Sequence, residues 1–284
     1  MPNEYPSRTL APLLPRVAVI LFAALQILTP MLPMIGIGQP IGSRSDSVQT
    51  LITPAGWAFS IWGPLYAGSI VFAIYQALPA QRDSTLLSHT RWPAAGAFLG
   101  NALWAAYTQV YGLSAISVAI IAFTLTCLLI IYRHFSRWRS GFSRSEQWLV
   151  VLPLSALAAW LTAATIVNVA AALRFHGFEV GDAASIIAAA IIIVGGLIAA
   201  AALVSGKGNP PYALVFLWAL AGIYAAGGQT SSPVGLATGV AAVLVIGALI
   251  LGLRRGGIER WFGRPNHAGG NGDLDPFYKP KRKP

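Results

Sequence analysis

The chain has very little charge. Of its 284 residues, 10% are Asp, Glu, Lys or Arg and 56% are hydrophobic, and its mean hydropathy is correspondingly high at +0.65. A soluble globular domain typically has about a quarter of its residues charged, so this composition excludes a water-exposed surface of the usual kind. The sequence therefore predicts an integral membrane protein.

Reactive and metal-binding side chains are scarce as well. The single cysteine, Cys127, excludes an intramolecular disulfide framework. The four histidines lie in predicted loops or at span ends, and the sequence places no second metal ligand at a suitable spacing from them, so we expect no metal site. No predicted span contains an ionisable residue at mid-depth, which removes the usual base of nucleophilic catalysis and the usual signature of proton-coupled transport. The residues favour a binding protein without catalytic residues or a required cofactor over an enzyme.

Charge-free stretches locate the membrane spans, because an apolar helix needs about 20 residues to cross a bilayer core of about 30 Å. Six stretches are long enough, and the two longest, 92–132 and 208–253, contain turn-forming residues near the middle. Each of these two predicts a helical hairpin, so the expected fold is all-α with eight spans. The predicted spans are 16–35, 54–78, 92–110, 115–134, 148–173, 184–204, 211–227 and 233–253.

Lys and Arg collect on one side when eight spans are threaded alternately across the membrane, and the other side receives only Arg44 and Arg174. We therefore expect a multi-pass protein of a bacterial cell membrane with both termini cytoplasmic. The basic C-terminal tail lacks the aromatic interleaving of a nucleic-acid site, so its expected partner is anionic lipid and not nucleic acid. The predicted parts are an N-terminal segment 1–15, a five-helix bundle 16–175, three additional helices 176–253 and a basic, disordered tail 254–284.

Aromatic residues recur at helical spacing in the second span. Phe59, Trp62 and Tyr66 lie at positions i, i+3 and i+7, which places them on one face of a helix, with Trp57 at its mouth. The alternative is that such stripes pack helix against helix and that Trp57 belongs to the interfacial belt of the membrane. Both interpretations remain open for any single tryptophan.

Two other spans combine tryptophan with an amide. Asn101 and Trp104 are three residues apart in the third span, and Trp160, Ala164 and Asn168 follow at steps of four in the fifth. Hydrocarbon offers no hydrogen bond, so these amides must find partners in the protein or in a ligand. Together the three stripes predict a mostly apolar pocket for a planar ligand, held by stacking and oriented by a few polar groups.

The same segments resemble a known family, TspO, which is also called translocator protein, peripheral benzodiazepine receptor or tryptophan-rich sensory protein. The run TPAGWAFSIWGPLY, residues 53–66, is similar to its second-helix signature through Trp62, Leu65 and Tyr66. Family members usually have one more residue between the Phe and the second Trp than lies between Phe59 and Trp62. This departure leaves the orientation of Trp57 and Phe59 open.

Two further motifs carry the resemblance. GNALWAAY is similar to the third-helix pattern through Asn101 and Trp104, and LPLSALAAWLTAATIVN resembles the fifth-helix pattern through Trp160 and Asn168. The likeness covers roughly residues 15–175 and leaves the last three spans unmatched. It implies a five-helix bundle whose ligand cavity is capped by the loop between helices one and two. The implied ligands are porphyrins, haem-type tetrapyrroles and, in some relatives, sterols.

The resemblance leaves several roles open. The leading hypothesis is a receptor or carrier that binds a tetrapyrrole or another flat hydrophobic ligand, in sensing, transport or turnover. One alternative is a small-molecule exporter that uses the additional helices, and a second is a porphyrin-degrading enzyme.

Charged and small residues add two minor hypotheses. Arg44 and Arg174 are candidate contacts for the carboxylates of a ligand, although both also suit ordinary loop or lipid-headgroup contacts. Gly96 and Gly100 form a small-xxx-small pattern that allows close helix approach. This pattern predicts either a homodimer interface or packing inside the chain.

Overall fold

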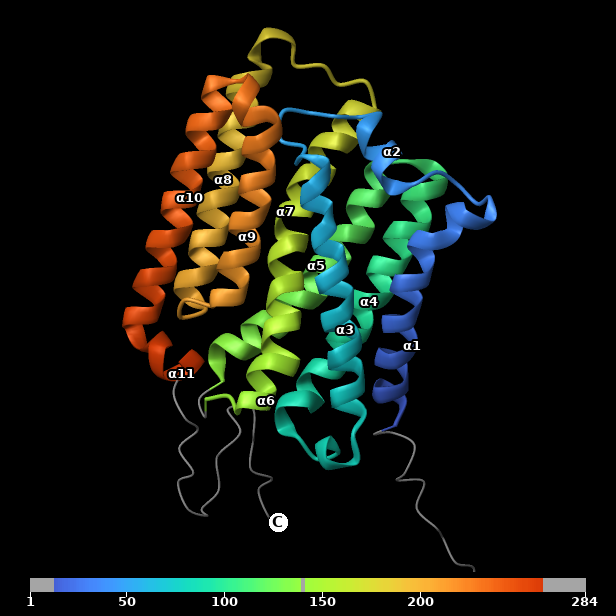
Figure 1. Ribbon diagram of the computed structural model, residues 1–284, viewed down its shortest axis with the longest axis vertical. Helices are drawn as coiled ribbons and strands as arrows, with labels where there is room; N and C mark the ends of the chain where they lie inside the picture. Colours follow the sequence, from blue (N-terminus) through green and yellow to red (C-terminus); the bar gives the residue numbers. More distant parts are fainter. Residues whose placement is uncertain (1–12, 139–140, 263–284) are drawn as a thin grey trace, which may run out of the picture.

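A computed structural model describes residues 13–138 and 141–262. Within these residues the regular structure is helical, and the expected all-α fold is confirmed (Figure 1). The long helices are α1 (Leu14–Leu28), α3 (Trp62–Ala77), α4 (Thr85–Tyr111), α5 (Ala115–Arg137), α7 (Leu152–Phe175), α8 (Ala184–Ser205), α9 (Pro210–Ile223) and α10 (Ser232–Gly252). The shorter helices are η1 (Thr29–Ile35), α2 (Ile41–Asp46), η2 (Gly56–Ile61), η3 (Pro79–Gln81), α6 (Arg144–Glu146), η4 (Gln147–Val151), η5 (Gly181–Ala183), η6 (Tyr224–Gly228), η7 (Leu253–Gly257) and α11 (Ile258–Phe262).

The helix ends follow local chemistry. Gly112 ends α4 with φ of 85°, a positive φ that glycine adopts without strain. Ser114 then begins α5, and its side chain accepts a hydrogen bond from the backbone N–H of Ile116. A capping box formed by Ser143 and Glu146 begins the helical segment that leads into α7. The first predicted hairpin therefore turns at the expected residues.

Seven helical segments among the described residues are long and apolar enough to cross a membrane. The eighth long helix, α4, has the length but is less apolar, since it carries residues such as Arg91, Asn101 and Gln109. All three of these side chains are buried against neighbouring helices and do not face lipid. The chain is thus an integral, multi-pass membrane protein of about eight helices.

Five helices close into a ring. Contacts run from α3 to α1, then to α4, α5 and α7, and from α7 back to α3. The other three lie outside this ring: α9 packs along α7, and α8 and α10 pack against each other beyond it (orange in Figure 1). We call these the five-helix ring and the three-helix layer. The end of the bundle at which α2 lies is called the α2 end.

Glycines permit the closest helix approaches. A Cβ added to Gly196 of α8 would lie 2.7 Å from the Cβ of Ala241 on α10. Gly96 faces α5, where an added Cβ would lie 2.9 Å from Cys127 Sγ, and Gly100 similarly faces Thr124. The pattern at Gly96 and Gly100 therefore serves packing between α4 and α5, and a homodimer stays a prediction.

The segment that follows α10 differs from the prediction of a disordered tail from residue 254. Helix α11 folds back on the end of α5, where the Arg260 guanidinium donates hydrogen bonds to the carbonyls of Phe135 and Ser136. Trp261 Nε1 donates to the Lys207 carbonyl at 2.9 Å. These contacts hold residues 258–262 against the end of α5 and against Lys207. The composition of this segment does not predict such contacts. The rest of the predicted tail and residues 1–12 lie outside the described residues.

Candidate functional site

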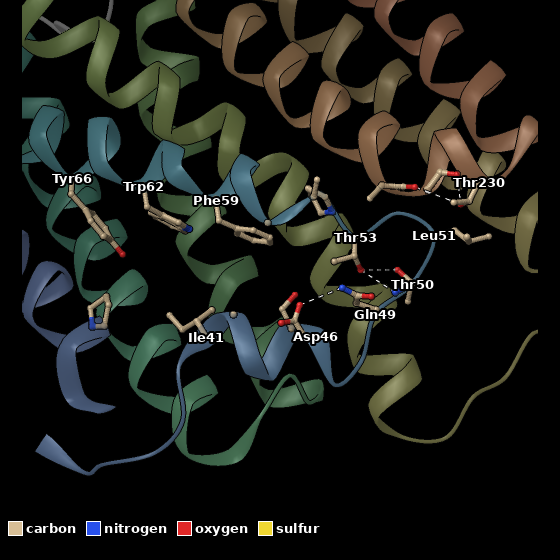
Figure 2. A pocket seen from close by; sticks show the side chains of 18 residues that line it. Ile41, Asp46, Gln49, Thr50, Leu51, Thr53, Phe59, Trp62, Tyr66 and Thr230 are labelled. Carbon is tan, nitrogen blue, oxygen red and sulfur yellow. Dashed lines mark hydrogen bonds between the residues drawn. The ribbon is translucent and has the colours of Figure 1, made fainter. Parts of the chain in front are cut away.

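A cavity of about 550 Å³ lies at the α2 end, where parts of three segments meet. Phe59, Trp62 and Tyr66 line one side from η2 and α3, and Asp46 lines the opposite side from α2 (Figure 2). Thr230, at the junction of η6 and α10, lines a third side together with neighbouring residues of η6. The five-helix ring and the three-helix layer therefore share this cavity.

The tight winding of η2 aligns the aromatic wall. In a 3₁₀-helix residues three apart eclipse each other, so Phe59 comes into line with Trp62, and the following α-helical turn adds Tyr66. The rings of Trp62 and Tyr66 stack at a centroid distance of 5.1 Å. The short spacing between Phe59 and Trp62 is thus accommodated, and Phe59 faces the cavity.

Trp57 has the opposite orientation. Its ring meets Trp218 of α9 edge to face at 4.9 Å, and its side chain is 48% exposed. It does not line the cavity, because it lies on the face of η2 turned toward the three-helix layer. A ligand contact of Trp57 stays a prediction, but its observed partner is α9.

Trp160 supports the aromatic wall from behind. Its ring meets Phe59 at 6.0 Å and Trp62 at 6.1 Å, both edge to face, and only 2% of its surface is exposed. Such T-shaped pairs stabilise by about 0.5–1.5 kcal/mol beyond their burial. Ala164, one turn further along α7, packs against the core. The structure therefore brings Trp160 to the site as a positioning residue and leaves Ala164 outside the lining.

The two predicted amides hydrogen-bond inside the protein. Asn101 Nδ2 donates to Gln26 Oε1 at 3.1 Å, which joins α4 to α1. Asn168 Oδ1 accepts a hydrogen bond from Ser117 Oγ at 3.0 Å, which joins α7 to α5. Trp104 packs against the main core and also against a small second cluster near the start of α5. These three side chains hold the ring together and do not line the cavity, so a ligand role for them stays a prediction.

Neither predicted arginine faces the cavity. Arg44 donates hydrogen bonds to the carbonyls of Gln109 and Val110, the closest at 2.8 Å, at the end of α4. Arg174 pairs with Glu179 at 3.0 Å in an exposed position. The geometry thus differs from the expectation of two carboxylate contacts, since other acceptors occupy both guanidinium groups. Asp46 is the charged residue of the cavity lining in the described part of the chain.

The three-helix layer anchors the loop that forms the cavity. The backbone N–H of Ala55 donates to the Gly222 carbonyl at 2.9 Å, and Trp218 Nε1 donates to the Ala58 carbonyl at 2.9 Å. Gly227 lies so close to Leu51 that an added Cβ would be 2.9 Å from its carbonyl carbon and nearer still to the oxygen. Sequence reasoning missed η6 as a wall. In the sequence, Gly227 and Gly228 are typical of a turn, but close backbone approach is the other common reason for glycine.

A second hollow has a different character. A groove of about 1160 Å³ runs between α3, α7 and α9 and is lined mainly by apolar side chains, including Trp148 and Trp261. It lies on the flank of the bundle, where lipid chains cover apolar surface without any hydrogen bond. The cavity at the α2 end, with its polar groups opposite an aromatic wall, is therefore the candidate site.

Comparison with known proteins gives one match. The family model described as TSPO-like protein matches residues 13–251. This range extends from the start of α1 almost to the end of α10, so it includes the three helices that the sequence resemblance left unmatched. No curated protein and no solved structure matched the chain.

Proposed function

The chain belongs to the TSPO-like protein family, and we propose that it binds a flat, hydrophobic ligand in the cavity between α2, α3 and η6. Family membership supports a membrane protein that binds or senses a ligand. A tetrapyrrole is the ligand class that the resemblance to TspO suggests. The geometry of the aromatic wall is the observation that carries this proposal.

Size and lining both support a planar ligand. A volume of about 550 Å³ falls in the usual range of small-molecule pockets, about 300–1,000 Å³. The row of Phe59, Trp62 and Tyr66 offers aromatic surface for offset stacking or edge contacts with a flat ring system. Hydroxyl and amide groups at the other end of the cavity would orient the ligand. Burial and dispersion would supply most of the affinity.

The position of the cavity supports a sensing role. Its lining includes the loop before α3 and also η6, which belong to the ring and to the layer respectively. A ligand that contacts both would change the relative stability of their contact, and such differential binding is what shifts a conformational equilibrium. Transport would require in addition that the same site open toward the opposite end of the bundle.

Octaethylporphyrin tests the proposal, because it is planar and carries no carboxylate. Titrated into the purified protein in a neutral detergent, it should quench tryptophan fluorescence saturably. Trp62→Ala should weaken binding about tenfold, since the loss of one stacking surface costs about 1.4 kcal/mol.

Trp92→Ala is the matched control, because Trp92 is exposed on α4 and does not line the cavity. It should lower the signal but leave the dissociation constant unchanged. Absence of saturable quenching, or equal affinity of the Trp62→Ala variant and the unmodified protein, would overturn the proposal.

A further inference from the structure

The charged residues at the α2 end differ in whether they have a partner inside the protein. The described residues there include two cations, Arg44 and Arg174, and three carboxylates, those of Asp46, Glu179 and Asp182. Arg44 is engaged by the carbonyls at the end of α4, and Arg174 by an ion pair with Glu179. No cation therefore neutralises Asp46 within ion-pair distance in the described part of the chain.

Asp46 is placed to meet a ligand. It is the last residue of α2, and in Figure 2 its side chain lies across the cavity from the row of aromatic rings. Gln49 Nε2 donates a hydrogen bond to its Oδ1 at 3.3 Å, which holds the carboxylate beside the cavity. The side chain is exposed, so water stabilises its negative charge before a ligand enters.

The neighbouring hydroxyls present acceptors more than donors. Thr230 Oγ1 donates its hydrogen to the Gly227 carbonyl at 3.0 Å, which leaves lone pairs for a ligand. The hydroxyls of Thr50 and Thr53 bond to each other at 3.2 Å, and Thr53 Oγ1 also accepts from the Thr50 N–H. This polar end therefore matches a ligand group that donates hydrogen bonds.

Aromatic rings opposite a carboxylate favour positive charge. A cation over the face of Trp or Tyr is attracted by the ring quadrupole, and quaternary ammonium groups are commonly recognised this way. We infer that the cavity selects planar ligands that carry an amine or ammonium group over ligands that carry a carboxylate. This inference rests on the proposed function, because it specifies the ligand class of the same cavity.

The preference has a consequence for tetrapyrroles. The carboxylates of a propionate-bearing porphyrin would meet Asp46 at the polar end and find no cation there. Such a porphyrin would bind more weakly than a porphyrin without carboxylates, or it would bind in an orientation that turns its carboxylates toward water. An aromatic amine meets no such penalty.

Three pyrene derivatives with the same ring system test the inference: 1-pyrenemethylamine, 1-pyrenemethanol and 1-pyrenecarboxylic acid. Their binding is measured by energy transfer from tryptophan to pyrene, in a neutral detergent at low salt. The amine should bind about fivefold more tightly than the alcohol, and the acid about fivefold more weakly, as expected for one exposed charge contact together with a cation–π contact. In Asp46→Asn the acid should bind as tightly as the alcohol, and the amine should keep only the part of its preference that the cation–π contact supplies, about twofold, with the affinity of the alcohol unchanged.

Asp182→Asn is the matched control, since it removes the same charge from the same end but does not line the cavity. It should keep the full preference for the amine. If Asp182→Asn reduces the preference as much as Asp46→Asn does, the general charge of this end and not Asp46 is responsible, and the inference is wrong.

The remaining outcomes separate the inference from the function on which it rests. Equal affinity of the three pyrenes for the unmodified protein, with weaker binding after Trp62→Ala, overturns the charge preference and keeps the ligand cavity. Failure of all three to saturate contradicts the proposed function itself.

Discussion

The five-helix ring and the three-helix layer are built differently. The ring buries amides and hydroxyls that hydrogen-bond from helix to helix, such as the pairs Asn101 with Gln26 and Asn168 with Ser117. In the layer, α8 and α10 approach closely where Gly196 meets Ala241, a contact of small residues typical of membrane helices. The ring thus supplies oriented polar and aromatic groups, whereas the layer supplies close backbone approach.

This difference explains why the layer contributes to the site mainly through its backbone. At Gly222 and Gly227 its backbone comes close enough to hold the loop before α3 and to form one wall of the cavity. The aromatic wall stays in the ring. We therefore expect substitutions in the layer to act through backbone position and substitutions in the ring through lost contacts.

The largest expected effect concerns the stability of the layer. Gly196→Ala places a Cβ 2.7 Å from that of Ala241, so α8 and α10 must move apart, whereas Gly247→Ala on α10 meets nothing within 4 Å. Overpacking costs about 1–3 kcal/mol, and the better helix propensity of alanine acts equally in both variants. Gly196→Ala should therefore be less stable than Gly247→Ala by about 2 kcal/mol in thermal unfolding followed by circular dichroism. Equal stability would contradict the close approach.

Gly227→Ala tests the contact between the layer and the loop. Its Cβ would collide with the Leu51 carbonyl, a backbone group that cannot rotate away. The loop should be displaced from η6, with about a tenfold loss of octaethylporphyrin affinity, close to 1.4 kcal/mol, and intact helix content. Gly239→Ala is the control, because nothing lies within 4 Å of its added Cβ. An unchanged affinity in Gly227→Ala would show that η6 is not a wall of the binding site.

Asn101→Leu tests whether the ring amides are structural. The substitution removes the donor to Gln26 Oε1 and leaves that oxygen buried. Interhelical hydrogen bonds in membranes contribute about 0.6–2 kcal/mol, so we expect a destabilisation of about 1 kcal/mol with ligand affinity unchanged within twofold. A loss of affinity larger than the loss of stability would instead support the sequence-based hypothesis that Asn101 contacts the ligand.

Arg174→Gln should have the smallest effect. The side chains of Arg174 and Glu179 are 49% and 75% exposed, and exposed pairs contribute about 0–1 kcal/mol. The affinity for protoporphyrin IX, which carries carboxylates, should stay within twofold of that of the unmodified protein. A tenfold loss would restore Arg174 as a carboxylate contact.

The helices were largely predictable because lipid imposes simple rules. A spanning segment must satisfy its backbone groups internally and avoid charge, so charge-free stretches and their turn residues identify α1, α3, α5 and the later helices. The sequence predicts α4 but begins it at residue 92, whereas the helix begins at Thr85. The difference arises because Arg91 interrupts the charge-free stretch, although its guanidinium donates hydrogen bonds inside the protein to Gln76 and Gln81. Such internal partners cannot be recognised from one sequence.

The site was predictable only in part for the same reason. Helical spacing correctly grouped Trp62 with Tyr66, because that relation is local. Because buried amides need hydrogen-bond partners, the sequence singles out Asn101 and Asn168. It does not show whether the partner is a ligand or another side chain, such as Gln26 or Ser117. The wall formed by η6 depends on contacts between residues far apart in the chain, which local patterns do not contain.

The central claim is that one ligand contacts the ring and the layer together, and cysteine protection tests it most directly. In a Cys127→Ala background, Gln49→Cys reports the side of α2 and Thr230→Cys the side of η6, while Gln229→Cys lies next to the cavity without lining it. Octaethylporphyrin should slow maleimide labelling of Gln49→Cys and Thr230→Cys at the same half-maximal concentration and leave Gln229→Cys unprotected. Protection of Gln49→Cys without protection of Thr230→Cys would contradict a shared cavity.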